Sequence, residues 1–373
     1  MAESNRLVDL VQLGIDDFLA ERATEFSAIA PELLRFTDLA ASYLAGGKRF
    51  RALFLYWGWQ SASGVAQGFD PLPDDSVSAD LPGIVLAAAA LEVFHAAALV
   101  HDDIIDRSDT RRGALAAHKR LEAMHVDEGW TGEAAQFGIS SGLLLGDLLL
   151  GWSDELFDAG TGRLANPSAG RSGRAEFNRM RTEVTAGQYL DILEENAWTQ
   201  HPETEALSRA HRVIVYKSAK YSVEAPLAIG AALGGGSLEQ LAALRAFGLP
   251  LGIAYQLRDD LLGVFGDPAV TGKPAGDDLR EGKRTVLIAL ARQQLSSQAR
   301  TLMDELLGDP ELDGQQVDIM RNTLRECGAV DQVERMIDRN VALAKDALRD
   351  APLAASARAQ LLELADTVTR RVY

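Results

Sequence analysis

The sequence predicts an all-α fold, and three observations lead to that prediction. Apolar residues recur three and four positions apart, Ala and Leu dominate, and no stretch sustains the period-two alternation of a strand. Hydrophobic residues make up 47 % and charged residues 24 % of the 373 residues, which is the composition of a globular protein with a core large enough to fold unaided. We expect a single domain that spans residues 1–373.

Several stretches have the length and composition of helices. In chain order they cover residues 31–45, 85–106, 139–154, 175–194, 204–232, 237–262, 285–307 and most of 315–368. Two segments predict loops, because residues 61–83 are rich in Asp, Ser, Pro and Gly, and residues 158–173 are rich in Gly, Ser and Ala. Since candidate site residues lie on both sides of each loop, we expect insertions between helices of one domain.

The chain is strongly acidic. Lys and Arg number 37, Asp and Glu number 54, and the formal net charge is −17. A surface of this charge repels nucleic acid and anionic lipid head groups, which argues against a nucleic-acid partner. An anionic ligand must therefore meet local groups of basic residues or bridging cations.

Compartment signals are few. The single cysteine, Cys327, has no partner for an intramolecular disulfide or a Cys-rich zinc site, so a reducing compartment fits. The N-terminus lacks a basic segment followed by an apolar one, so no secretory signal is visible. The most apolar stretch, residues 81–100, contains Glu92 and His95, which favours a buried core helix over a membrane span. We expect a cytoplasmic protein with no transmembrane segment.

An acidic motif ends the helix predicted over residues 85–106. Asp102 and Asp106 are four apart in HDDIID, so their side chains lie on one helical face. Oxygen ligands suit a hard cation such as Mg²⁺, which is typically shared with substrate phosphates. Arg111 and Arg112 follow at loop distance, and their planar donors match phosphate oxygens. The pattern indicates a diphosphate clamp; the alternative is a solvated acidic helix end that the arginines merely neutralise.

A second acidic motif lies far downstream in YQLRDDLLG, which covers residues 255–263. The Gly- and Pro-containing segment after it carries Lys273 and Lys283 and suits a loop that closes over an anion; a surface loop of mixed charge is the alternative. Two more basic groups occur, GGKRFR over residues 46–51 and KSAKY over residues 217–221. The distance along the chain leaves open whether the two acidic motifs face each other.

These motifs, in this order over roughly residues 40–290, resemble the trans-type polyprenyl diphosphate synthases. The resemblance implies an all-helical bundle around a deep central cavity, usually a homodimer, with two aspartate-rich motifs on facing helices that hold three Mg²⁺ ions. It also implies the reaction. An allylic diphosphate ionises, the double bond of isopentenyl diphosphate attacks the carbocation, and loss of a proton leaves a chain five carbons longer.

The resemblance also assigns roles residue by residue. The implied metal ligands are Asp102, Asp106 and Asp259, with Asp103 in support. The implied ligands of the allylic diphosphate are Arg111, Lys217 and Lys273, with Lys283 also binding substrate. The residues that match isopentenyl diphosphate ligands are Lys48, Arg51, His95 and Arg112. Ser218 and Gln256 match groups beside the allylic carbons, and Gln188 and Asp191 match partners of these ligands.

Two departures from the family pattern concern the second motif and the Lys217 segment. Gly263 stands where many relatives have a third Asp, and Ser218 stands where Thr is common. The first Asp of the second motif is retained, so we expect the metal site to survive with weaker Mg²⁺ affinity.

The length of the product is expected to depend on the helix before the first motif. In the family this helix lines the tunnel for the growing chain. Ala98 and Ala97 leave the first layer open, and Phe94 one turn lower can form a floor. We therefore predict geranylgeranyl diphosphate, with a longer product as the next choice.

Two other functions compete with this prediction. A class I terpene cyclase shares the DDxxD motif, but its NDxxSxxxE metal triad is not found in this sequence. A non-catalytic regulatory subunit of a partner synthase usually loses the aspartates, whereas this chain keeps Asp102, Asp103, Asp106, Asp259 and Asp260.

Overall fold

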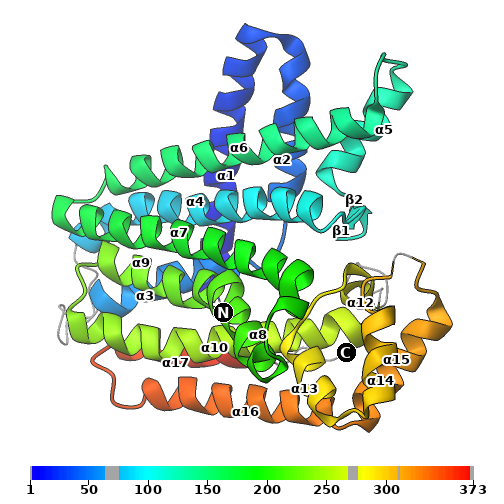
Figure 1. Ribbon diagram of the computed structural model, residues 1–373. Helices are drawn as coiled ribbons and strands as arrows, with labels where there is room; N and C mark the ends of the chain where they lie inside the picture. The colour runs from blue at the N-terminus through cyan, green and yellow to red at the C-terminus, as the bar shows by residue number, and fades with distance from the viewer. Residues whose placement is uncertain (1, 64–74, 268–275, 310, 370–373) are drawn as a thin grey trace. The chain divides into compact units, whose positions relative to one another are not determined.

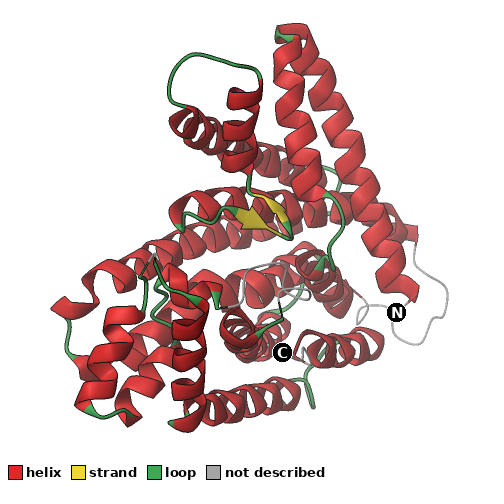
Figure 2. Ribbon diagram, turned by 90° about the vertical axis from the view of Figure 1, so that its right-hand side faces the viewer, coloured by secondary structure: helices red, strands yellow, loops and turns green. Residues whose placement is uncertain are grey.

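The computed structural model describes residues 2–63, 75–267, 276–309 and 311–369. The described residues are almost entirely helical, as predicted (Figure 1). Their exception is one short antiparallel hairpin of β1 (Thr110–Arg111) and β2 (Ala114–Leu115), drawn in yellow in Figure 2. The fold class is therefore the one that the apolar periodicity indicated.

The chain divides into two compact units. Unit 1 contains Met1–Ala175 and Pro226–Ser237, and unit 2 contains Glu176–Ala225 and Leu238–Tyr373. The chain passes from one unit to the other at three points, so neither unit is a continuous segment.

Unit 1 is built around a pair of long helices, α4 (Asp75–Ile105) and α6 (Ala134–Thr161). They approach closely at Gly83 and Gly160, where a Cβ on either glycine would lie 2.6 Å from the carbonyl oxygen of the other. The other helices of the unit are α1 (Ala2–Ile29), α2 (Leu34–Leu44), α3 (Phe50–Ser63), α5 (Ala117–Asp127), α9 (Ala225–Leu233) and the start of α7 (Pro167–Ala197).

Both long helices are apolar enough to cross a membrane by length and composition. The most apolar window of Ala79–Ile105 is 78 % buried, and that of Ala134–Thr161 is 33 % buried. Burial of the first window agrees with the core helix predicted for residues 81–100. The second helix leaves apolar side chains exposed.

Unit 2 is centred on α10 (Leu238–Phe265), which packs against α16 (Ala329–Ala347) and a π-helical stretch, Ile214–Glu224. A Cβ at Gly252 would lie 2.4 Å from the Ala219 carbonyl oxygen, so only glycine permits this approach. The remaining helices are the larger part of α7, α8 (Ala206–Val213), α12 (Asp277–Glu281), α13 (Val286–Gln294), α14 (Ser297–Leu306), α15 (Gly314–Glu326), α17 (Ala355–Thr369) and short 3-10 turns that include Trp198–Gln200.

The two predicted loops were wrong over much of their length. In the predicted loop 158–173, α6 continues to Thr161 and α7 begins at Pro167, where a missing N–H costs nothing in the first turn. In the predicted loop 61–83, α3 continues to Ser63 and α4 begins at Asp75 and includes Pro82; residues 64–74 lie outside the described residues. The small residues that suggested loops are instead places where two helices pack closely.

Candidate active site

The first acidic motif lies at the end of α4. Asp102 and Asp103 belong to its last turn, and the Asp106 backbone N–H donates to the Asp102 carbonyl at 2.8 Å, which extends the turn past Ile105. The Asp103 side chain is fully buried, whereas that of Asp102 is 21 % exposed. Asp102 is therefore partly exposed at the end of α4, whereas Asp103 points into unit 1.

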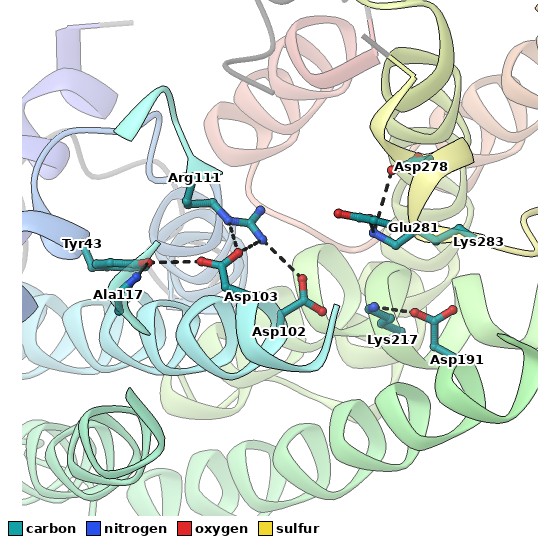
Figure 3. Close-up of polar contacts among 10 residues, drawn as sticks. All are labelled: Tyr43, Asp102, Asp103, Arg111, Ala117, Asp191, Lys217, Asp278, Glu281 and Lys283. Atoms are coloured by element: carbon teal, nitrogen blue, oxygen red, sulfur yellow. Dashed lines mark hydrogen bonds and ion pairs between the residues drawn. The ribbon is translucent and has the colours of Figure 1, made fainter. Parts of the chain in front are cut away.

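Asp103 connects four elements of unit 1 (Figure 3). Its carboxylate accepts hydrogen bonds from the Tyr43 hydroxyl at 3.1 Å and from Arg111 Nε at 2.8 Å. The same hydroxyl accepts from the Ala117 backbone N–H at 2.7 Å. Burial alone would lower the pKa of Arg111, but the carboxylates of Asp103 and Asp102 more than compensate, so the pKa lies above its ordinary value. Asp103 is thus engaged in fixing Arg111.

Arg111 and Arg112 owe their positions to the β1–β2 hairpin. Thr110 pairs with Leu115 and Arg111 with Ala114, which leaves Arg112 and Gly113 as a two-residue loop. Both loop residues have positive φ, 52° and 77°, as a type I′ turn requires. An Arg in the left-handed conformation costs about 1–2 kcal/mol relative to a residue with negative φ. The turn therefore positions Arg112 at a cost in backbone conformational energy.

The basic loop GGKRFR is fixed by a buried ion pair. Arg49 is 6 % exposed and donates from Nη1 to Glu92 Oε2 at 3.3 Å, and it also donates to the Leu44 carbonyl oxygen. The other oxygen of Glu92 accepts from the Ala52 backbone N–H at 3.2 Å, in the first turn of α3. Glu92 therefore pairs with Arg49 of the loop and also accepts a hydrogen bond from the first turn of α3. Lys48 of the same loop is exposed.

His95 lies one turn after Glu92 on α4, among the predicted isopentenyl diphosphate ligands. Burial lowers the pKa of His95 well below its ordinary value, and the positive charges of Arg51, Arg112 and Arg111 lower it further, against the smaller opposite effect of Asp102. The imidazole is therefore neutral at pH 7. Unit 1 thus brings together predicted ligands from three separate motifs.

The second acidic motif lies in α10 of unit 2. Asp259 is exposed and Asp260 is buried. Gln256 Nε2 donates to Asp260 Oδ1 at 2.7 Å. Burial, followed by the nearby charge of Asp278, raises the pKa of Asp260 to about 8. Asp260 therefore holds Gln256 in place, while Asp259 faces solvent.

Gly263 has a structural consequence that sequence reasoning missed. A Cβ at this position would collide with the carboxylate of Asp278, which comes from α12. Asp278 faces Lys283, with its Oδ1 3.8 Å from Nζ, and Lys283 also pairs with Glu281 at 2.5 Å (Figure 3). The Asp278 carboxylate thus fills the space beside Gly263. The only sign of this carboxylate in the sequence is the GDD at residues 276–278, shortly before EGKR.

Lys217 occupies the π-helical stretch of unit 2, and its Nζ lies 2.5 Å from Asp191 Oδ2 on α7 (Figure 3). The two helices approach at Gly187, where a Cβ would lie 2.3 Å from the Lys217 backbone nitrogen. π-helical turns are rare and frequently occur at functional sites. Ser218 follows in the same stretch, and Lys273 lies outside the described residues.

The carboxylates offer an incomplete metal site. Among the described residues, no three His, Cys, Asp or Glu side chains stand close enough to hold a metal ion by themselves. Mg²⁺ is usually bound through one or two carboxylates together with water and substrate phosphates. Asp102 and Asp106 in unit 1, and Asp259 in unit 2, fit this mode.

The residues predicted to control product length lie on α4. Phe94 is 4 % exposed and Ala97 is fully buried, whereas Ala98 is partly exposed. Ala98 therefore has more open space beside it than Ala97 has.

Comparison with known proteins assigns the chain to a family. A model described as polyprenyl synthetase matches residues 35–324. The geranylgeranyl diphosphate synthase of Methanosarcina mazei is 29 % identical, with 98 % of this chain and 100 % of that protein covered. The geranylfarnesyl diphosphate synthase of Aeropyrum pernix is 28 % identical, with 93 % and 97 % covered.

The solved structures agree. The geranylgeranyl pyrophosphate synthase of Corynebacterium glutamicum, complexed with isoprenyl diphosphate and magnesium, superposes with a TM-score of 0.88 at 36 % identity, and 98 % of this chain and 99 % of that chain are covered. Helical fold, motif order and both comparisons lead to one conclusion: this chain belongs to the polyprenyl synthetase family and is a trans-prenyltransferase that makes prenyl diphosphates.

Proposed function

We propose that the chain condenses isopentenyl diphosphate with allylic diphosphates in a Mg²⁺-dependent reaction and releases all-trans geranylgeranyl diphosphate. The observation that carries this proposal is the end of α4, where the partly exposed Asp102 lies 3.5 Å from Arg111, an arginine that the buried Asp103 fixes. The solved relative complexed with isoprenyl diphosphate and magnesium supports the same ligands here.

The allylic diphosphate is bound by carboxylates and cations. Asp102, Asp106 and Asp259 would hold Mg²⁺, three ions in the family pattern, and Mg²⁺ bound there would stabilise the charge of the departing diphosphate. Arg111 adds a guanidinium whose orientation Asp103 sets. Lys217, together with Lys273 and Lys283, adds further positive charge to the leaving group.

Isopentenyl diphosphate is bound by the basic residues of unit 1. Lys48, Arg51 and Arg112 neutralise its diphosphate, and neutral His95 contributes a hydrogen bond without a further charge. The oxygens of Ser218 and Gln256 orient toward the allylic cation and stabilise it by their dipoles.

Product length is set by α4, with Ala97 and Ala98 leaving room for growth and Phe94 as the floor. Both twenty-carbon and twenty-five-carbon synthases are among the relatives, which supports a product in this range. Geranylgeranyl diphosphate is our choice, and geranylfarnesyl diphosphate is the alternative.

We further propose a single-domain, cytoplasmic homodimer. The exposed apolar side chains of α6 support the dimer: Ile139, Leu143 and Leu144 are 37 %, 44 % and 62 % exposed. Interlacing of the two units along the chain supports a single domain.

The test is incubation of the purified protein with labelled isopentenyl diphosphate, each allylic primer in turn, and Mg²⁺ or a chelator. We expect a twenty-carbon product after dephosphorylation and chromatography, and loss of at least 99 % of the product with chelator. A hydrocarbon formed from geranylgeranyl diphosphate alone would indicate a cyclase. No product from any primer would indicate a regulatory subunit.

A further inference from the structure

Tyr43 lies near the end of α2 and is not among the substrate and metal ligands of the proposed function. Its hydroxyl lies between two other elements of unit 1, α4 and the start of α5 (Figure 3). It donates to Asp103 Oδ2 at 3.1 Å and accepts from the Ala117 backbone N–H at 2.7 Å. A tyrosine hydroxyl has a single proton, so these two bonds fix its direction toward Asp103.

The bond to Ala117 fixes the start of α5. The first N–H groups of a helix have no partner within the helix. The residue before α5 is Ala116, whose methyl side chain cannot accept a hydrogen bond. The Tyr43 hydroxyl therefore supplies from α2 the acceptor that a polar N-cap side chain usually provides.

The bond to Asp103 fixes the carboxylate that orients Arg111. The terminal torsion of an Asp side chain is broad, so partners on both oxygens are needed to hold the carboxylate in one plane. Arg111 Nε donates to Asp103 Oδ1 at 2.8 Å and Arg111 Nη2 donates to the same oxygen, whereas Tyr43 donates to Oδ2. The Asp103 side chain is fully buried, so bulk water is not positioned to replace the hydroxyl.

The two bonds also enclose the segment that carries Arg111. Asp103 precedes the β1–β2 hairpin and Ala117 follows it, so one hydroxyl connects both ends of residues 103–117. A long arginine side chain loses much rotamer freedom when a ligand orders it. If the protein orders the guanidinium in advance, the ligand binds more tightly.

We propose that Tyr43 is a positioning residue for the allylic diphosphate: through Asp103 it holds the Arg111 guanidinium in the orientation that meets the diphosphate oxygens. This inference rests on the proposed role of Arg111 as a ligand of the allylic diphosphate. The effect of Tyr43 on that substrate is transmitted by Arg111. Isopentenyl diphosphate is bound by other residues and should not depend on the hydroxyl.

The test is a double-mutant cycle of Tyr43→Phe and Arg111→Lys. Tyr43→Phe removes the hydroxyl and keeps the ring, and Arg111→Lys keeps the charge without the planar donors. Calorimetry with farnesyl thiodiphosphate, an unreactive allylic analogue, measures the dissociation constant in the presence of Mg²⁺, and kinetics gives the KM of each substrate. The matched control is Tyr56→Phe, whose hydroxyl also donates to a carboxylate of unit 1, that of Glu3, at 2.5 Å. Circular dichroism melting checks that each protein is folded.

We expect Tyr43→Phe to weaken binding of the analogue and to raise the KM of the allylic substrate, each by about three- to tenfold. The KM of isopentenyl diphosphate should change by less than about twofold. The double variant should bind the analogue no more weakly than Arg111→Lys alone, because the hydroxyl acts through the guanidinium that lysine replaces. Tyr56→Phe should leave both KM values and the dissociation constant unchanged.

Multiplication of the two single effects in the double variant would overturn the proposal, since Tyr43 would then act independently of Arg111. An equal rise of both KM values, which a general loss of structure produces, would also overturn it, as would unchanged analogue binding in Tyr43→Phe. A crystal of the wild type with the analogue should show Arg111 on the diphosphate and still bonded to Asp103; a guanidinium turned away from Asp103 would contradict the proposal. A wild type that binds the analogue but elongates no primer would contradict the proposed function alone.

Discussion

At the scale of single residues, the aspartates of the first motif differ in burial and therefore in what they can contact. Asp103 is fully buried and connects Tyr43 to Arg111, whereas Asp102 is 21 % exposed and lies 3.5 Å from Arg111. The sequence predicted a metal-binding role for Asp102 and Asp106 with Asp103 in support, and this division gives Asp103 a specific contact. The metal role itself stays a prediction.

His95 leads to a prediction about pH. The pKa of His95 lies below its ordinary value in the folded protein. Below about pH 6.5, His95 therefore binds a proton in the unfolded chain but stays unprotonated in the folded chain. As the pH is lowered, the free energy of unfolding should decrease more steeply in the wild type than in His95→Gln. The difference in slope should be up to about 1.4 kcal/mol per pH unit. Urea unfolding at pH 7 and pH 5.5 measures this, and equal losses in both proteins would refute it.

Gly263 leads to a second prediction, which runs against the family pattern. Restoring the third aspartate as Gly263→Asp should lower stability by about 1–3 kcal/mol, because its side chain meets the carboxylate of Asp278. Urea unfolding measures the change. Adding Asp278→Asn should recover part of the loss by removing the like charge; a stable Gly263→Asp protein that binds Mg²⁺ more tightly would show that the space is free.

At the scale of elements, most of the long helices were predicted from apolar residues three and four positions apart, but some helices with the same spacing were not. The helix over residues 2–29 was missed, although Leu7, Val11, Ile15 and Leu19 recur every four residues and are buried. The stretch over residues 158–173 was assigned to a loop because glycine composition is the same in a turn and at a close helix contact. Gly160 and Gly173 pack against other helices, which only tertiary structure reveals.

The site was predictable as a set of motifs, but its internal pairing was not. The sequence named Lys217 and Asp191 separately, and the structure joins them at 2.5 Å. It gave no sign that Arg49 would be buried while Lys48 stayed exposed, because that depends on a carboxylate more than forty residues away. That both aspartate motifs act on one diphosphate stays a prediction, since they lie in different units of the chain.

The helix α4 carries a prediction about product length. Ala98→Phe adds a ring at a partly exposed position one turn before Asp102 and should shift products toward fifteen carbons. Ala97→Phe should also shorten them but cost stability, since that position is fully buried. Chromatography of dephosphorylated products measures the distribution. Ala79→Phe, at an exposed position of the same helix, is the control, and unchanged products in both Ala97 and Ala98 variants would contradict the prediction.

At the scale of the whole molecule, the exposed leucines of α6 lead to a prediction about the proposed dimer. Leu144→Glu should weaken self-association by at least about tenfold, because a charge would be buried in an apolar interface. Sedimentation velocity over a range of protein concentrations measures it. Leu238→Glu, an 87 % exposed leucine of another helix, should leave the association unchanged. Equal sedimentation of the wild type and both variants would place the interface elsewhere.

The ion pair between Arg49 and Glu92 has an implication for how such chains diverge. Both side chains are about 5 % exposed, so losing either one strands the other's charge away from water at a cost of about 3–5 kcal/mol. A lineage can replace both with a neutral pair, but it passes through a damaged intermediate on the way. We therefore expect positions 49 and 92 to change together across descendants, whereas any change at positions 48 and 51, which we propose as substrate ligands, should be independent of them.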